Sequence, residues 1–381
     1  MIGSLALLLA CGFLIAHLAT VAIVLWRLRP NRKQAGFIGL PRVTLLRPVC
    51  GLDTFDAETL ESSFLQDYPD YEVIFCADLE TDPAVPLLRR LIAAYPKLRA
   101  QVLIGKSAIS GNPKLNNLAK GWRAAQSDWI CMTDSNLLLP RDYLRQVVQS
   151  WGPNTGLVSS PPVGSRPSGF AGSLECAFLN SNQARLQLTS DSLGMGFAQG
   201  KTLFWNRKIL ERGGGLAVLG RYLAEDVSAT KLVRAQGLHV TLTPAPFAQP
   251  IGKRGFSQVL NRQIRWSRVR RDGFPALFAM EFLNGAAVPL LVMALATATL
   301  PLPPLVIAGY AALWYGAETI LIRRAGWPGH WRDLLALPVR DALLPVLWGV
   351  TFLRRGIEWR GNLMQAAPQK PAAELNRKPA L

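Results

Sequence analysis

A long apolar segment opens the chain. Leu5 to Trp26 is almost unbroken apolar sequence and is long enough to cross a bilayer. A cleaved signal peptide would need basic residues before a shorter apolar run and a small-residue cleavage site, and this segment shows neither. Basic residues follow it instead, at Arg27, Arg29, Arg32 and Lys33. The positive-inside rule therefore predicts that residues 1–33 anchor the chain with the following domain in the cytoplasm.

More apolar segments lie near the other end. Residues 286–300 and 305–322 are separated by the Pro-rich turn PLPP, which predicts a helical hairpin that crosses the membrane and returns. The segment 334–353 is interrupted by Arg340, Asp341 and Pro345. We therefore expect residues 286–364 to form a membrane hairpin followed by a re-entrant or interfacial segment. The Pro-, Lys- and Ala-rich tail, residues 365–381, has the composition of a disordered segment.

Between these segments, strand-like and helix-like patterns alternate. This alternation predicts an α/β domain with a mainly parallel sheet over residues 34–252. The expected helices cover residues 54–66 and 87–95, with a third from residue 112. The expected strands are VTLLRPVCG (43–51), YEVIFCA (71–77), QVLIG (101–105) and the apolar run from Trp129 to Met132.

Two of these strands end in an acid. Asp78 follows residues 71–77, and Asp134 follows the run that ends at Met132. In parallel sheets, ligands bind beyond the carboxyl ends of the strands. Asp134 and Asn136 offer a pair of hard oxygen ligands that Mg²⁺ or Mn²⁺ can share with a diphosphate. Alternatively, Asp134 only caps the next turn.

The segment NPKLNN, residues 112–117, begins a predicted helix. It brings Lys114 and Asn116 to a helix N-terminus, where backbone N–H groups and a cation favour an anion. A solvated helix cap is the alternative. Further along, Gly200 precedes a predicted strand, where it either lets a ligand approach the backbone closely or simply forms a turn.

Two acids, Glu225 and Asp226, begin another predicted helix. Acids at this position stabilise a helix N-terminus, but a carboxylate in a cleft can also act as a general base. The next helix is basic and amphipathic, with seven Lys or Arg among residues 253–271. Such a helix can bind a membrane surface, nucleic acid or a diphosphate, and the adjacent apolar segments favour the first and third. We therefore expect residues 253–285 to lie at the membrane interface.

Composition agrees with a membrane protein that has basic faces. The net charge is +17, with 50% apolar and 18% charged residues. The five cysteines form no CxxC pair, so the sequence implies neither a zinc site nor a disulfide framework and fits a reducing compartment.

Four motifs in order resemble those of the ceramide glucosyltransferases and their bacterial relatives, including those that glycosylate hopanoids. The resemblance covers nearly the whole chain and implies a GT-A glycosyltransferase domain, Rossmann-like with a mainly parallel sheet, between N- and C-terminal transmembrane helices. The motifs are an acid after the second strand, an Asp-Ser step, an Ala-Glu-Asp step and an (R/Q)xxRW sequence. They stand here as Asp78, Asp134, Asp226, and Arg262 with Arg265 and Trp266.

The resemblance implies a role for each of these residues. Asp78 would bind the uracil or ribose of a UDP-sugar, Asp134 a divalent cation on the diphosphate, and Asp226 would be the base. Two departures matter. The metal step is Asp-Ser-Asn rather than Asp-x-Asp, and Asp82 is a second candidate for the nucleotide acid. The expected contacts of the nucleotide sugar are Asp78, Lys114, Asn116, Gly200, Arg262, Arg265 and Trp266.

The activity that the resemblance implies is transfer of a hexose, glucose by expectation, from a UDP-sugar to the primary hydroxyl of ceramide. The anomeric centre inverts and the product is a β-glycosylceramide. A hopanoid acceptor, with GlcNAc or another hexose, is the alternative. A processive polysaccharide synthase and a non-catalytic lipid-binding scaffold are more distant ones. We expect a multi-pass protein of the bacterial inner membrane with its catalytic domain in the cytoplasm and no nucleic-acid partner.

Overall fold

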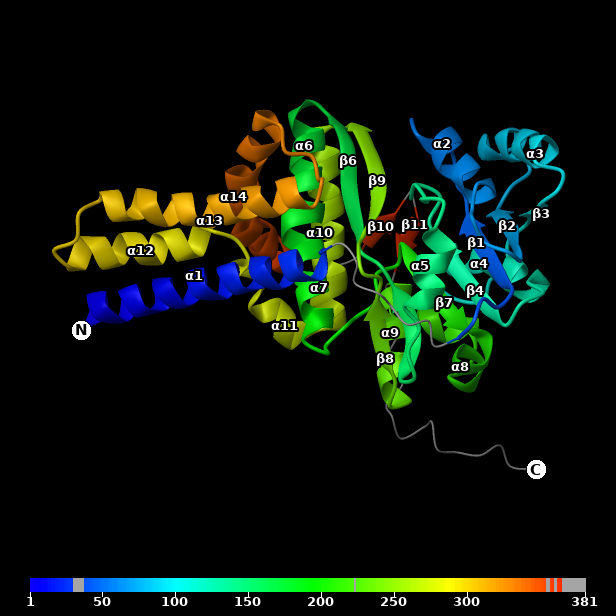
Figure 1. Ribbon diagram of the computed structural model, residues 1–381, viewed down its shortest axis with the longest axis horizontal. Coiled ribbons are helices and arrows are strands. Elements are labelled where there is room, and N and C mark those ends of the chain that lie inside the picture. The colour runs from blue at the N-terminus through cyan, green and yellow to red at the C-terminus, as the bar shows by residue number, and fades with distance from the viewer. Residues whose placement is uncertain (30–37, 223, 354–356, 360–361, 365–381) are drawn as a thin grey trace.

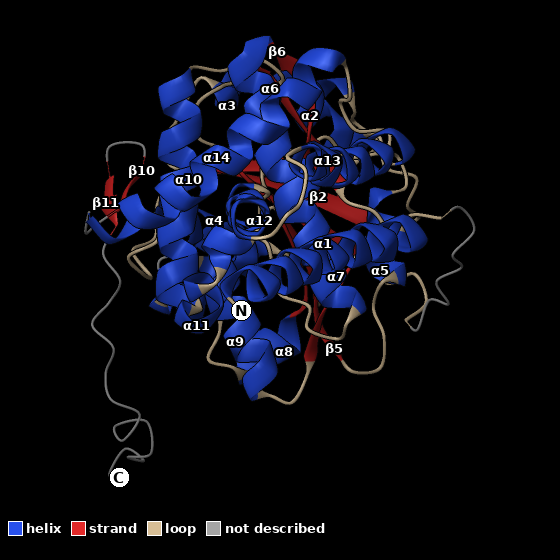
Figure 2. Cartoon of the chain, turned by 90° about the vertical axis from the view of Figure 1, so that its left-hand side faces the viewer, coloured by secondary structure: helices blue, strands red, loops and turns tan. Residues whose placement is uncertain are grey.

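The computed structural model describes residues 1–29, 38–222, 224–353, 357–359 and 362–364. An α/β body carries the long helices α1 (Ile2–Arg27), α12 (Ala287–Thr299) and α13 (Leu305–Arg324), which extend away from it side by side (Figure 1). Figure 2 looks from that side and shows α12 and α13 nearly end-on. The expected tail and part of the basic cluster after the first span lie outside the described residues.

The body is built on a twisted sheet that, within the described residues, has seven strands in the order β3-β2-β1-β4-β7-β5-β8. Only β7 runs antiparallel to its neighbours β4 and β5, so the expectation of a mainly parallel sheet is confirmed. The strands are β1 (Val43–Pro48), β2 (Tyr71–Ala77), β3 (Arg99–Ile104), β4 (Trp129–Thr133), β5 (Thr155–Ser159), β7 (Thr202–Asn206) and β8 (His239–Leu242).

The register brings the ends of β2 and β4 to one edge of the sheet. Pro48 in β1 pairs with Cys76 in β2, and Leu46 in β1 pairs with Met132 in β4. All three strands are parallel, so their carboxyl ends form a common edge, which we call the carboxyl edge. Asp78 and Asp134 therefore follow strands that end at the same edge, as expected.

Helices flank this sheet. They include α2 (Asp56–Glu61), α3 (Ala84–Ala94), α4 (Pro113–Ala124), α5 (Tyr143–Gln149), α8 (Arg207–Arg212) and α9 (Glu225–Ala235). Helix α4 lies against β1 and β2. Its Gly121 permits this contact, because a Cβ there would lie 2.3 Å from Leu46 Cδ1 and 2.6 Å from Cys76 Sγ. This close packing holds the start of α4, with Lys114, at the carboxyl edge.

A second small sheet joins the body to the long helices. Strands β6 (Pro162–Ser168) and β9 (Phe247–Lys253) pair in parallel, and α6 (Gly169–Ala177) packs on them. The chain continues from α6 through a π-helix (Phe178–Ala184) into α7 (Arg185–Ser192). The expected basic helix is α10 (Phe256–Gly273), and it contacts α6. The sequence patterns did not predict this second sheet.

The three long helices pack on one another through small and aromatic residues. Helix α1 contacts both α12 and α13, around a cluster that includes Ala10, Met293 and Trp314. Among the described helices, α1, α13 and α14 (Trp331–Leu353) are long and apolar enough to cross a membrane. Helix α12 has 13 residues, about 20 Å, which is shorter than the hydrocarbon core of a bilayer. The crossing hairpin therefore stays a prediction.

Helix α14 is continuous through both of its prolines, Pro338 and Pro345. It packs along α6 and α10, and Figure 1 shows it running across the direction of α1 and α13 rather than along it. This course agrees with an interfacial segment, whereas its length and composition would also allow a crossing. The remaining short elements are η1 (Ser62–Phe64), η3 (Leu216–Arg221), α11 (Pro275–Ala279), η4 (Glu281–Leu283), β10 (Ile357–Trp359) and β11 (Asn362–Met364).

One arginine fastens the first helix to the body. Arg27, at the end of α1, is buried and pairs with Asp191 at 2.7 Å. Its guanidinium also donates to the carbonyls of Leu242 and Thr243, at 2.9 and 2.8 Å. A planar group with five donors suits several acceptors at once. The body is therefore held directly at the end of the first apolar helix.

Candidate active site

The candidate site lies at the carboxyl edge. A buried arginine holds the loop after β4 there. Arg47, in β1, is fully buried, and its guanidinium donates to the backbone carbonyls of Asp134, Ser135 and Leu137, at 2.8 to 2.9 Å. Thr59 Oγ1 donates to the Ser135 carbonyl at 2.7 Å as well. These bonds fix the Asp-Ser-Asn loop, so that the Asp134 side chain projects from a rigid support.

Two lysines flank Asp134. Lys114 Nζ lies 2.6 Å from Asp134 Oδ1, and Lys201 Nζ lies 2.9 Å from Oδ2. Burial raises the pKa of this carboxyl, but the two ammonium groups outweigh burial and hold the pKa well below its ordinary value. Burial lowers the pKa of the Lys201 ammonium, against the opposing effect of Asp134, and Arg262 adds to the lowering. Asp134 is therefore a carboxylate at any pH near neutrality.

The expected metal ligands, Asp134 and Asn136, contact ammonium groups in this arrangement. Lys201 Nζ donates to Asn136 Oδ1 at 2.9 Å in addition to its contact with Asp134. Both carboxylate oxygens of Asp134 and the amide oxygen of Asn136 are thus taken by ammonium groups. Among the described residues, no group of three or more His, Cys, Asp or Glu side chains gathers where it could hold a metal ion. Metal binding by Asp134 and Asn136 stays a prediction.

Lys114 connects three parts of the chain. Besides Asp134, its ammonium contacts Glu225 Oε1 at 2.6 Å and donates to the Gly200 carbonyl at 2.8 Å. Burial lowers the pKa of Lys114, but the two carboxylates raise it above its ordinary value. Asn112 caps α4 and donates to Glu225 Oε2 at 3.0 Å. The NPKLNN segment therefore binds carboxylates of the protein itself, which the sequence did not indicate.

Asp226, the expected base, forms no ion pair among the described residues and is hydrogen-bonded by backbone N–H groups instead. Its Oδ2 accepts from the Gly200 backbone N–H at 3.0 Å, and its Oδ1 accepts from the Val227 N–H at 2.8 Å. Burial and, to a smaller extent, the neighbouring Glu225 carboxylate raise the pKa of Asp226 to about 6, against the opposing effects of the Gly200 N–H, the Lys114 ammonium and the Val227 N–H. A carboxylate with a pKa near neutrality is a better proton acceptor than an ordinary aspartate. Glu225 is tied to Lys114, so Asp226 is the acid suited to act as the base.

Gly200 is necessary for this arrangement. A Cβ at this position would lie 2.7 Å from Glu225 Oε1 and 3.6 Å from Asp226 Oδ2. Glu225 cannot easily move away, because Asn112 and Lys114 hold its two oxygens. The absence of a side chain thus lets the Gly200 backbone bond both an acid and a lysine.

Asp78 and Asp82 have different surroundings. The two oxygens of Asp82 accept from the Gly51 N–H, at 3.1 and 2.9 Å, and Oδ1 also accepts from the Ala84 N–H at 2.8 Å. Asp82 therefore holds the loop after β1 and the start of α3. Asp78 follows β2 directly, and its Oδ1 is buried without a hydrogen-bond partner among the described residues. Of the two acids, Asp78 is the one with an acceptor left for a ligand.

Asn116 holds a loop. Its Oδ1 accepts from the backbone N–H groups of Ile109 and Ser110, at 3.0 and 2.9 Å, and its Nδ2 donates to the Ser110 carbonyl. Both ends of the amide are used in shaping the segment before α4. Direct contact of Asn116 with a nucleotide sugar stays a prediction.

The (R/Q)xxRW residues lie on α10. Arg262 forms an ion pair with Glu175 in α6, whose side chain is almost fully buried. Trp266 packs against Cys176, Leu179 and Ile251. Arg265 is half-buried on the same helix. The structure thus brings Lys114, Asp134, Asn136, Gly200 and Asp226 together, while Asp78, Asn116, Arg262 and Trp266 have no hydrogen bond or ion pair to that group among those described.

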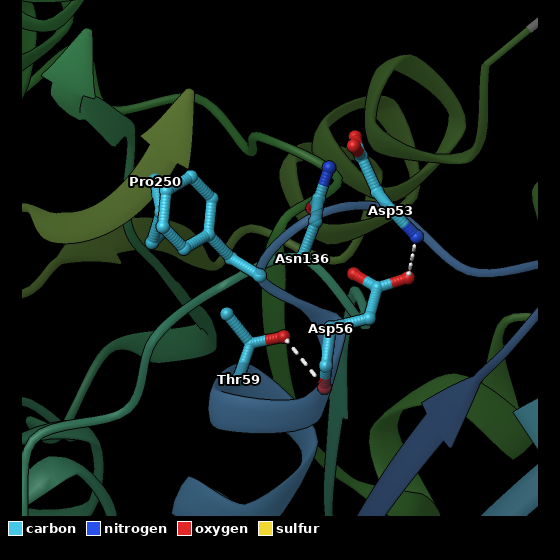
Figure 3. Close-up of a pocket in the computed structure, with 6 residues that line it drawn as sticks. Asp53, Asp56, Thr59, Asn136 and Pro250 are labelled. Atoms are coloured by element: carbon cyan, nitrogen blue, oxygen red, sulfur yellow. Dashed lines mark hydrogen bonds between the residues drawn. The ribbon is translucent and has the colours of Figure 1, made fainter. Parts of the chain in front are cut away.

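A small hollow borders the site. It is lined by Asn136 with Asp53, Phe55, Asp56, Thr59 and Pro250. Figure 3 shows Asn136 beside the two acids, with Asp56 accepting from the backbone N–H of Asp53 at 2.7 Å. Arg254, at the end of β9, pairs with Asp53 at 2.6 Å. The site is therefore bordered next to Asn136 by this small hollow and by the second sheet.

Sequence reasoning missed several residues of the site. Lys201 was not singled out, although it follows Gly200 directly and precedes an apolar strand. Arg47 also gave a signal, since an arginine inside the apolar run VTLLRPV must find partners when that strand is buried. The contacts of Glu225 with Asn112 and Lys114 had no local signal.

Comparisons with known proteins define the class. A mannosyltransferase from Pyrobaculum calidifontis, solved in complex with GDP-Man and Mn²⁺, superposes with a TM-score of 0.52 and 21% identity. The match covers 90% of this chain and 99% of that one. The fold is therefore that of the GT-A glycosyltransferases, as expected from the sequence.

The family follows from sequence comparison. The model of glycosyl transferase family 21 matches residues 7–372, so the chain belongs to this family. Ceramide glucosyltransferase 1 of Caenorhabditis elegans is 28% identical over 257 residues, which is 67% of this chain and 55% of that protein. Ceramide glucosyltransferase 3 of the same organism is 24% identical over 366 residues, 94% of this chain and 79% of that protein. The chain thus spans just over half of the first relative and about four fifths of the second.

Proposed function

We propose that this chain is a membrane-bound inverting glycosyltransferase that moves a hexose, glucose, from a UDP-sugar to the primary hydroxyl of ceramide. The family match over residues 7–372 carries the proposal, together with the ceramide glucosyltransferase relatives. The raised pKa of Asp226, whose oxygens accept from backbone N–H groups, supports its assignment as the base. The product is a β-glycosylceramide.

The reaction is a single displacement. The acceptor oxygen forms a bond to the anomeric carbon as the bond from that carbon to the diphosphate oxygen breaks. The hydroxyl proton passes to Asp226, and the electron pair of the broken bond leaves with UDP. Asp78, with an unpartnered buried oxygen, serves the uracil or ribose. Arg262 and Arg265, on α10, carry positive charge toward the departing diphosphate.

The membrane explains the arrangement of the body. A sugar nucleotide is soluble, whereas the hydroxyl of a lipid acceptor stays at the bilayer surface. The body is fastened to the end of α1 by Arg27, and the basic helix α10 packs along α14, across the direction of α1 and α13 (Figure 1). We infer that the body lies on the cytoplasmic face of a bacterial inner membrane, with α10 near the headgroups.

The decisive experiment is expression in a host that supplies both ceramide and UDP-sugars, followed by lipid extraction and mass spectrometry. We expect a new hexosylceramide that is absent with the Asp226→Asn variant. A glycosylated hopanoid in a hopanoid-producing host, with no change in ceramide, would replace ceramide as the acceptor. No new glycolipid in either host would contradict the proposed function.

A further inference from the structure

We propose that Lys201 is a built-in cation that stabilises the leaving diphosphate, so that the site binds a nucleoside diphosphate without a divalent metal ion. This inference rests on the proposed function in one respect, the use of a nucleoside diphosphate donor. It starts from the disagreement between the expected metal ligands and the groups that occupy them.

The Lys201 ammonium lies where a cation on the diphosphate is expected. Lys201 Nζ lies between Asp134 Oδ2 and Asn136 Oδ1, at 2.9 Å from each. These are the two oxygens that a diphosphate-bound cation would need. A divalent ion bound there would have to displace Lys201 and would stand close to Lys114, which is 2.6 Å from Asp134. The ammonium groups of Lys114 and Lys201 would repel a divalent ion there. Lys201 already supplies a positive charge at this position.

The two lysines differ in the number of N–H donors that the protein uses. An ammonium group has three N–H donors. Lys114 has three acceptors, on Asp134, Glu225 and the Gly200 carbonyl. Within the part of the chain that the structure describes, Lys201 has two, on Asp134 and Asn136. Lys201 thus has a donor left for a phosphate oxygen, and Lys114 does not.

The surroundings of the Lys201 ammonium strengthen its interaction with a phosphate. The Lys201 side chain is 12% exposed, so its ammonium is largely desolvated, and its partner Asn136 lines the small hollow of Figure 3. A charge at the bottom of a shielded site interacts more strongly with a phosphate than a charge in water does. As the bond from the anomeric carbon to the diphosphate breaks, the negative charge that develops on UDP meets this N–H. Lys114 instead holds Asp134, Glu225 and Gly200 in position.

The test uses the full chain in detergent micelles and measures binding of UDP by calorimetry. We expect wild-type affinity for UDP to be the same in EDTA and in MnCl₂. Lys201→Met should weaken UDP binding in EDTA about tenfold to a hundredfold, the effect of losing one charged hydrogen bond, and leave uridine binding unchanged. Lys201→Arg keeps the charge and should bind UDP without metal. It serves as the second variant if Lys201→Met fails to fold.

Lys208→Met is the matched control, because Lys208 is 77% exposed and pairs only with Asp128 among the described residues. It should bind UDP as the wild type does. Wild-type binding that needs Mn²⁺, with a loss of more than tenfold in EDTA, would overturn the inference and leave the proposed function standing. The opposite result, UDP bound in EDTA but no glycolipid formed, would support the inference and contradict the proposed function.

Discussion

Replacing Asp226 by asparagine tests the central assignment. The substitution keeps the shape of the side chain, and its amide oxygen can still accept from the Gly200 N–H, which lies 3.0 Å from Oδ2. It removes the proton acceptor. General base catalysis contributes about 10² to 10⁴ in rate, which is about 3 to 5 kcal/mol of activation free energy. We therefore expect hexose transfer to fall by at least a hundredfold, with UDP affinity nearly unchanged.

The pH profile gives an independent check on Asp226. The base works only as a carboxylate, and burial together with Glu225 raises its pKa to about 6. In the wild type, kcat/KM should therefore fall as pH drops below about 6 and level off above it. The residual rate of the Asn variant should show no such step. An Asn variant that keeps more than about a tenth of wild-type turnover would refute the role of Asp226.

Stability separates loss of the base from loss of the fold. The pKa of Asp226 is higher in the folded chain than in the unfolded one, so its charged form destabilises the fold progressively as pH rises from about 4 to about 6. Asp226→Asn removes that charge but turns an NH₂ group toward the Val227 N–H, so the two effects oppose each other and thermal unfolding at neutral pH should stay close to the wild-type temperature. Asp128→Asn, at an exposed acid, is the control and should leave turnover, the pH profile and stability unchanged.

Other predictions test the neighbouring residues and the topology. Gly200→Ala should lower kcat about tenfold or more, because the added methyl would lie 2.7 Å from Glu225 Oε1. Wild-type kinetics would contradict this. Asp78→Asn should weaken UDP binding about tenfold without lowering the melting temperature, whereas Asp82→Asn should cost about 1 kcal/mol of stability and spare UDP binding; calorimetry and thermal melts distinguish the two. Cysteines at Leu302 should be labelled from outside intact cells, and those at Asn31 only after permeabilisation; labelling of Asn31 in intact cells would reverse the proposed orientation.

The sequence by itself determined strands β1 to β4 and the acids that follow two of them, but not the strands of the second sheet. Apolar runs such as YEVIFCA can be stable only when buried, so β2 covers the same residues that the pattern predicted. Asp134 and Asp226 were found because an acid directly after such a run, or at the start of a helix, is a local signal. The first apolar segment became α1 for the same reason, since hydropathy and length are properties of the local sequence.

Only the tertiary structure decided what surrounds those acids. Lys201 reaches Asp134 because β7 inserts antiparallel beside β4, and Lys201 and Asn136 are 65 positions apart in the chain. Lys114 meets Glu225 across 111 positions. Periodicity reports which face of an element is buried, but strand order and the meeting of distant side chains depend on packing of the whole chain. For this reason the sequence predicted a metal ligand at Asp134, and only the fold showed the two lysines beside it.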